Sequence, residues 1–135
     1  MKMDELERIR ARKMQELMSR QSQAAGRSIS ESPIQVTDSD FESLIQKYPL
    51  MVIDCWAAWC GPCRMLAPVV EELARDYAGK IVFGKLDVDE NPRTAMNFGV
   101  MSVPTLLIIK NGKLVDQIVG AAPRDYIESR LRKHM

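Results

Sequence analysis

Hydrophobic and polar positions alternate in blocks from residue 34 onward, and these blocks predict strands separated by helices. Short apolar runs predict strands at residues 34–36, 50–56, 81–87, 105–109 and 114–119. Between and after these runs, apolar residues recur at helical spacing, which predicts helices that begin near residue 41, after residue 63, after residue 91 and at residue 124. The pattern is that of an α/β chain.

The run at residues 50–56 is apolar on both faces of a strand except at Asp54, which predicts a central strand that is covered on both sides. The helix that follows it contains Pro68, which we expect to kink it, and Gly79 stands where it can end. The apolar residues at helical spacing in this segment are Met65, Leu66, Val69, Val70, Leu73 and Tyr77.

Turn and cap residues separate these elements. The Asn-Gly pair at residues 111–112 lies between two apolar runs and predicts a tight hairpin. Asp38 or Ser39 is expected to accept hydrogen bonds from the free N–H groups of the helix that begins near residue 41. Asn91, which precedes a proline, is expected to cap a short helix.

Strand-helix-strand units followed by a hairpin and a last helix predict an α/β fold with a central mixed sheet and helices on both of its faces. The strand-helix-strand connections are expected to be right-handed. Functional residues of such sheets lie beyond the carboxyl ends of the strands. The residues that follow the strand at 50–56 are therefore the first place to look for a site.

Residues 1–20 contain good helix formers and opposite charges four positions apart, so they predict an amphipathic helix. Its apolar residues are Met3, Leu6, Ile9, Met14, Leu17 and Met18, with Arg10 among them. Two interpretations stand: a solvated or loosely docked helix, or a helix that binds a partner or a second copy of the chain. Residues 21–32 are rich in Ser, Gln and Ala and predict a flexible linker. We therefore expect an N-terminal helix and linker at 1–33 and one domain at 34–135.

Composition narrows the class of protein. The chain has 135 residues, 46% of them hydrophobic, which suits a single domain with a real core. No apolar run is long enough to span a membrane, and the charged N-terminus has no apolar signal core, so a cytoplasmic protein is expected. The net charge is only +1, which gives no reason to expect nucleic-acid binding. Three cysteines are too few for a secreted disulfide framework and favour redox chemistry.

Two of these cysteines form the motif Trp59-Cys60-Gly61-Pro62-Cys63. The motif stands between the predicted strand and the predicted helix, where free backbone N–H groups and the helix dipole favour a thiolate. Such a pair can close into a disulfide and open again. The alternatives are a static disulfide, or half of a zinc site whose other candidate ligands are Cys55 and His134.

Four segments together resemble the thioredoxin family: residues 52–65 with the Cys pair, 103–105, 110–112 and 119–120. They occur in the family's order and spacing, and the resemblance covers residues 34–135. It implies a thioredoxin fold and a reversible Cys60–Cys63 disulfide that reduces disulfides in other proteins. It also implies that no bound cofactor or metal is needed.

The resemblance assigns chemical roles. Cys60 is expected to attack the substrate disulfide, and Cys63, one helical turn later, to resolve the mixed disulfide. Burial should raise the pKa of Asp54 and suit it to exchange a proton with Cys63 through water; a structural ion pair is the alternative. Lys85 matches the family's lysine that faces this aspartate, although a strand lysine is often simply exposed.

The resemblance also implies a substrate surface. Pro104 is expected to follow a cis peptide bond, with the backbone before it binding an extended substrate; the alternative is an ordinary loop proline. The surface would comprise Trp59, Gly61, Pro62, Val103, Pro104 and Gly120. Trp56 is expected to pack in the core beneath the site, and Pro68 to be structural. Two departures stand out: Cys55 replaces the usual aromatic residue and should be buried opposite Asp54, and Ser102 stands where glycine is common.

The expected partners are proteins that contain disulfides and a thioredoxin reductase, with NADPH or, as the second choice, ferredoxin as its electron source. No nucleic acid or membrane is expected as a partner, and the protein is expected to be a monomer. An oxidase or isomerase is the alternative within the same chemistry, although Gly-Pro between the cysteines favours a reductase. A binding module that docks through residues 1–20 is the alternative from a different class.

Overall fold

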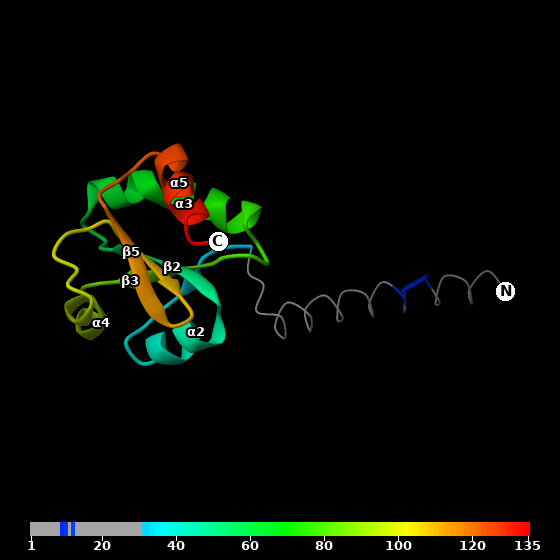
Figure 1. Ribbon diagram of the computed structural model, residues 1–135, viewed down its shortest axis with the longest axis horizontal. Coiled ribbons are helices and arrows are strands. Elements are labelled where there is room, and N and C mark those ends of the chain that lie inside the picture. Colours follow the sequence, from blue (N-terminus) through cyan, green and yellow to red (C-terminus); the bar gives the residue numbers. More distant parts are fainter. Residues whose placement is uncertain (1–8, 11, 13–30) are drawn as a thin grey trace.

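The computed structural model describes residues 9, 10, 12 and 31–135. Within 31–135 it contains five strands and four helices (Figure 1). The strands are β1 (Ile34–Gln35), β2 (Leu50–Trp56), β3 (Val82–Asp87), β4 (Thr105–Lys110) and β5 (Lys113–Val119). The helices are α2 (Phe41–Lys47), α3 (Gly61–Asp76), α4 (Pro92–Asn97) and α5 (Arg124–Arg132). The predicted order of elements is confirmed, and their bounds differ from the expected ones by a few residues at most.

The strands form one mixed sheet in the order β1-β3-β2-β4-β5. β1, β3 and β2 are parallel, whereas β4 runs antiparallel to both β2 and β5. The predicted central position of β2 is therefore confirmed. Because successive side chains of a strand alternate between its two faces, Asp54 and Cys55 of β2 point to opposite faces of the sheet.

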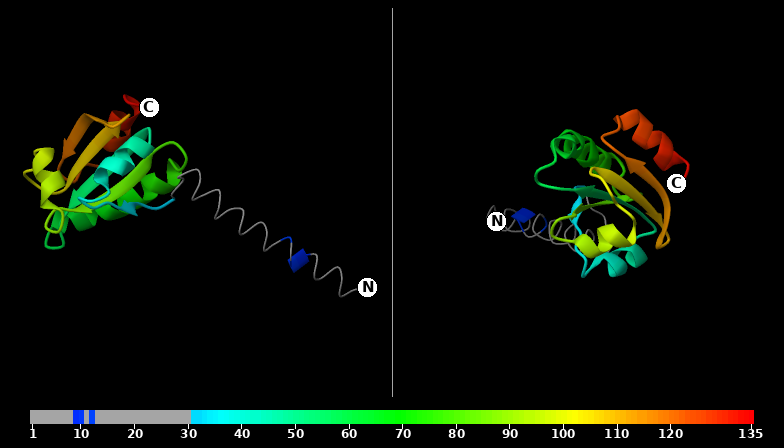
Figure 2. Two further views of the ribbon diagram at one scale, coloured as in Figure 1. Left: turned by 90° about the horizontal axis from the view of Figure 1, so that it is seen from below. Right: turned by 90° about the vertical axis from the view of Figure 1, so that its left-hand side faces the viewer.

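Helices cover both faces of the sheet, with α3 and α5 on one side and α2 and α4 on the other (Figures 1 and 2). On the first side, Leu66 and Val70 of α3 pack with Ile127 of α5 and with Val52 of β2. The core on the other side includes Phe41 and Ile45 of α2, Met51, Ile53 and Cys55 of β2, and Leu107 and Ile109 of β4. Because both of their faces are buried, the inner strands β2 and β4 are mostly apolar, whereas the edge strand β5 is largely exposed and carries polar residues.

Local sequence explains the hairpin between β4 and β5. Asn111 and Gly112 adopt positive φ angles of 51° and 78°, the combination required at the two central positions of a type I′ turn. The predicted hairpin is therefore confirmed at the expected residues. The turn sets the register beside it, where Lys110 pairs with Lys113. An irregularity between Ile108 and Ile109 then shifts the pairing by one residue, so that Thr105 pairs with Val119 at the far end from the turn.

The predicted caps are wrong in detail. Asp38 does not cap α2 but accepts hydrogen bonds from the backbone N–H groups of Arg93 and Thr94 at 3.2 and 2.8 Å, so it caps α4. Asn91 does precede α4, yet its side chain accepts from the N–H of Asp38 at 2.9 Å instead of capping its own helix. The loop before α2 thus holds α4 in place across more than 50 residues of sequence.

Two further expectations about helices need comment. Met65 is 75% exposed, so it does not belong to the buried face of α3; a residue adjacent to Leu66 lies about 100° around a helix from it. Pro68 lies within α3, which continues on both sides of it. None of the helices over the described residues is both long and apolar enough to cross a bilayer.

The amphipathic helix predicted at residues 1–20 lies largely outside the described residues, and so does most of the linker predicted at 21–32. Of that helix, Ile9, Arg10 and Arg12 are described; they are helical and exposed.

Candidate active site

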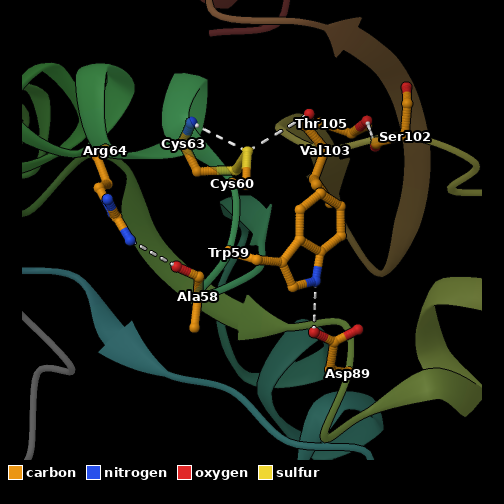
Figure 3. Close-up of a disulfide and its surroundings, with 9 residues drawn as sticks. All are labelled: Ala58, Trp59, Cys60, Cys63, Arg64, Asp89, Ser102, Val103 and Thr105. Carbon is orange, nitrogen blue, oxygen red and sulfur yellow. Dashed lines mark hydrogen bonds between the residues drawn. A yellow bond between two sulfur atoms is a disulfide. The ribbon is translucent and has the colours of Figure 1, made fainter.

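The cysteine motif lies at the junction between β2 and α3, beyond the carboxyl end of the central strand. Cys60 is the N-cap residue of α3, and Pro62 occupies the first turn, where its missing N–H leaves no donor unpaired. Cys60 and Cys63 form a disulfide with a Cα–Cα distance of 5.3 Å (Figure 3). The motif therefore places both sulfur atoms at the helix N-terminus, as the sequence predicts.

The surroundings of Cys60 favour negative charge on its sulfur in the dithiol form. The backbone N–H of Cys63 donates a hydrogen bond to Sγ of Cys60 at 3.2 Å (Figure 3). A donor at the positive end of the helix dipole stabilises a thiolate more than a thiol. The carbonyl oxygen of Val103 lies 3.7 Å from the same sulfur.

Val103 belongs to a loop that precedes β4 and contains a cis peptide bond to Pro104, as predicted. The carbonyl of Pro104 accepts a hydrogen bond from the N–H of Gly120 at 2.8 Å, and Thr105 donates its hydroxyl to the carbonyl of Ser102 at 2.7 Å. The Pro104 ring is buried, whereas Val103 is half-buried. The face that this loop offers to solvent is therefore its backbone together with Val103, Ser102 and Met101 rather than the proline ring.

Asp54 is buried in β2 on the α3 side of the sheet, with 1% of its surface exposed. Burial raises its pKa from 3.8 to about 6, and the positive charge of Lys85 offsets part of that rise. Among the described residues, neither carboxylate oxygen has a hydrogen-bond partner. The alternative of a structural ion pair is therefore not favoured, because desolvation changes the pKa of Asp54 more than the charge of Lys85 does.

Lys85 stands opposite Asp54 in the parallel register of β2 and β3, so the two side chains share one face of the sheet. Its ammonium group lies 5.2 Å from the centre of the Trp56 ring. A cavity of about 120 Å³ is lined in part by Lys85, Trp56 and Cys63. This cavity is large enough for water, and water in it would lie between Cys63 and Lys85.

The two tryptophans differ from each other. Trp59 is 70% exposed beside the disulfide. Trp56 is half-buried and borders the cavity, so the expectation that it packs in the core beneath the site is only partly right.

The possible zinc ligands are not brought together. Cys55 is fully buried on the opposite face from Asp54, and burial raises its pKa to about 12. His134 lies 3.1 Å from a carboxylate oxygen of Asp116 near the end of the chain. Over the part of the chain that the structure describes, no three His, Cys, Asp or Glu side chains are grouped to hold a metal ion.

Comparison with known proteins decides the family. The thioredoxin family model matches residues 32–133. Thioredoxin 2 of Chlorobaculum tepidum is 52% identical over 102 residues, which cover 75% of this chain and 94% of that protein. A thioredoxin of Staphylococcus epidermidis is 53% identical over 102 residues, which cover 76% and 97%. The chain belongs to the thioredoxin family.

The fold of this thioredoxin family member agrees with a solved structure. The N21Q mutant thioredoxin from Halobacterium salinarum NRC-1 superposes with a TM-score of 0.72 and 34% sequence identity, covering 76% of this chain and 90% of that one. With the Cys60–Cys63 pair in place, the protein is a thiol–disulfide oxidoreductase. The family match favours this function over a binding module, an alternative that rests on residues 1–20, largely outside the described part of the chain.

Two side chains that support this thioredoxin site, those of Asp89 and Arg64, were not predicted from the sequence. The indole N–H of Trp59 donates to a carboxylate oxygen of Asp89 at 2.8 Å (Figure 3). Arg64 donates to the carbonyl oxygen of Ala58 at 3.0 Å, which closes the loop before Cys60 (Figure 3). Asp89 follows the carboxyl end of β3, and that position in a parallel sheet was the one signal available for it.

Proposed function

We propose that this protein reduces disulfides in other proteins and that Cys60 is its nucleophile. The observation that carries the proposal is the position of Cys60 Sγ, 3.2 Å from the N–H of Cys63 at the start of α3 and 3.7 Å from the carbonyl of Val103. The first contact stabilises a thiolate, and the second marks the backbone along which an extended substrate would lie.

The reaction proceeds in two exchanges. The Cys60 thiolate attacks one sulfur of the substrate disulfide, forms a mixed disulfide and releases the other substrate sulfur as a thiolate. Cys63 then loses its proton, attacks Cys60 Sγ and releases the second substrate thiolate. Two electrons pass to the substrate, and the protein is left with the Cys60–Cys63 disulfide.

Asp54 accepts the proton of Cys63 in the second exchange. With a pKa of about 6, its carboxyl is mostly ionised at neutral pH yet basic enough to take up a proton. Water in the cavity beside Cys63 would carry the proton as far as Lys85, which lines that cavity and shares a face of the sheet with Asp54. Lys85 supports the same step by keeping Asp54 ionised between turnovers.

The substrate surface comprises Trp59, Gly61, Pro62, Val103 and Gly120, and the buried Pro104, which was expected on this surface, supports it from below. Gly61 has nothing within 4 Å of the position a Cβ would take, so it leaves open space beside the disulfide. Val103 contributes its carbonyl group, and the Gly120 N–H supports the loop from below through Pro104. Trp56 and Pro68 have structural roles near the site.

The remaining parts of the proposal concern the setting of the reaction. A thioredoxin reductase that uses NADPH would return the disulfide to the dithiol, with a ferredoxin-dependent enzyme as the second choice. The protein would act as a monomer in the cytoplasm, where its few cysteines suit a reducing environment. Residues 34–135 would form the catalytic domain, and the helix and linker predicted at 1–33 lie largely outside the described residues.

Reduction of insulin driven by dithiothreitol tests the proposal. The wild type should accelerate precipitation of the insulin B chain, and Cys60→Ser should reduce the rate to that of dithiothreitol alone. Cys55→Ala is the matched control, because it removes the one thiol outside the pair and should retain turnover. Equal rates for the wild type and Cys60→Ser would overturn the proposal.

A further inference from the structure

The ring of Trp56 lies against the ammonium group of Lys85. Trp56 and Asp54 are two residues apart on β2, so they share one face of the sheet, and Lys85 stands opposite Asp54 on that face. The ammonium nitrogen lies 5.2 Å from the centre of the Trp56 ring, within the range at which the negative face of an aromatic ring attracts a cation. The site itself holds the ring in place, because the ring packs against the buried cluster that contains both cysteines of the motif.

Lys85 borders three cavities, which offer its flexible side chain different surroundings. One, of about 120 Å³, is lined in part by Trp56 and the resolving cysteine, and a second, of about 240 Å³, by Trp56 and Asp87. The third, of about 410 Å³, is lined in part by Glu31 and Glu71 but not by Trp56. Over the described residues, Lys85 forms no ion pair with any of these three carboxylates, so the ring of Trp56 fixes its direction.

The direction of Lys85 matters because its charge acts on Asp54 through space. Asp54 has no hydrogen-bond partner among the described residues; burial raises its pKa, and the positive charge of Lys85 opposes that rise. A Coulomb interaction is halved when the distance between the charges doubles, so a lysine that turned into the third cavity would lose much of its effect on Asp54. The charged groups that face Lys85 from the surrounding elements are Asp54 on β2, Asp87 on β3, Arg64, Glu71 and Arg75 on α3, and Glu31 before β1. The carboxylates outside β2 compete with Asp54 for the ammonium group.

We propose that Trp56 is a positioning residue for the resolving exchange: its ring keeps the ammonium group of Lys85 beside Asp54 and out of the third cavity. The role in the exchange rests on the proposed function, in which Asp54 takes up the proton of Cys63, whereas the position of Lys85 does not depend on it. An indole ring attracts a cation most strongly, a phenyl ring does so less, and an aliphatic side chain offers no such attraction. Substitutions of Trp56 therefore give a graded series.

Titration of Asp54 in the oxidised full-length protein tests the position of Lys85, because the closed disulfide does not titrate. The carboxyl carbon of Asp54 is followed by carbon NMR across the acidic and neutral pH range. In Trp56→Leu the pKa of Asp54 should rise by roughly one pH unit, and in Trp56→Phe by about half as much. The acidic limb of the pH profile of insulin reduction should move to higher pH by the same amounts.

Further variants separate this effect from a general loss of packing. Lys85→Met should raise the pKa of Asp54 at least as much as Trp56→Leu does, and adding Trp56→Leu to Lys85→Met should not raise it further. Tyr126→Leu is the matched control: it breaks an equivalent contact, in which the guanidinium carbon of Arg130 lies 5.7 Å from the centre of the Tyr126 ring, and should leave the titration of Asp54 unchanged. Because Trp56→Phe keeps an aromatic ring, it serves as the test if Trp56→Leu does not fold.

Two results would overturn the inference and leave the reductase intact. In the first, Asp54 titrates in the folded Trp56 variants as it does in the wild type. In the second, Trp56→Leu raises the pKa of Asp54 equally with and without Lys85, which would mean that the ring acts on Asp54 directly. Failure of the proposed function looks different: if the pKa moves as expected but the wild type reduces no insulin, Trp56 still holds Lys85 but has no part in an exchange.

Discussion

Asp54→Asn is expected to make the protein more stable at neutral pH. The carboxyl lies in the central strand, 1% exposed and without a hydrogen-bond partner among the described residues. Above pH 6 it must carry a charge in that setting, whereas in the unfolded chain the charge is solvated. Asparagine has nearly the shape of the protonated acid and cannot ionise, so the variant avoids this cost.

The magnitude follows from the pKa values. A carboxyl with a pKa of about 6 in the folded protein and 3.8 when solvated lowers the free energy of unfolding by about 3 kcal/mol at pH 8. For a domain of about 100 residues, 1 kcal/mol corresponds to roughly 4 °C in melting temperature, so the variant should melt about 12 °C higher.

The dependence on pH has a definite sign. Between pH 3.8 and about 6 the folded protein binds more protons at Asp54 than the unfolded chain does, so the stability of the wild type falls as pH rises through this window. Below the window Asp54 is neutral in both states, and the advantage of the variant should vanish. Above it the advantage should stay constant.

Urea unfolding of the oxidised proteins at pH 3.5, 5 and 8 measures these differences. Glu90→Gln is the matched control, since it removes an exposed acid close to the same sheet end and should change stability little at any of these pH values. Equal stability of Asp54→Asn and wild type at pH 8 would refute the reasoning. An advantage that persists undiminished at pH 3.5 would do so too, because ionisation would then not be its source.

Three other predictions follow from particular contacts. Cys63→Ser should leave substrate proteins attached to Cys60 as mixed disulfides, which mass spectrometry after thiol blocking would detect; attachment at another cysteine would contradict the assigned order of attack. Gly84→Ala should lower the free energy of unfolding by about 1–3 kcal/mol in urea, because its Cβ would lie 2.6 Å from Cγ2 of Val36; unchanged stability would contradict this and would mean that the Val36 side chain moves aside at little cost. Asp116→Asn should destabilise the protein at pH 7 but progressively less below pH 3.8, since hydrogen bonds from an arginine and a histidine lower the pKa of Asp116; a loss that is independent of pH would contradict this.

Much of the fold was predictable because its signals are local. The run at 50–56 has one polar residue, which indicated a central strand, and Asn111 with Gly112 fixed the hairpin through positive φ angles. The position of the Cys pair between a strand and a helix likewise depends only on neighbouring residues. These features require no knowledge of which segments meet in space.

The errors concern contacts between distant segments. Asp38 had the right chemistry for a cap, but only the packed structure shows that it caps α4 rather than α2. Alternation placed Asp54 and Cys55 on opposite faces. That Lys85 faces Asp54 was expected only from the family resemblance, because the pairing depends on the register of β2 and β3. The contact between Trp59 and Asp89 joins two loops that the sheet brings together, and no local pattern encodes it.

The most direct test of the account is which thiol of the reduced protein reacts first. Reduced protein is treated at pH 7 with a limiting amount of iodoacetamide, and the modified cysteine is identified by mass spectrometry of its peptides. The account predicts modification at Cys60, because the helix N-terminus and the N–H of Cys63 favour its thiolate. Modification at Cys63 or Cys55 at an equal or greater rate would contradict the claim that Cys60 is the nucleophile.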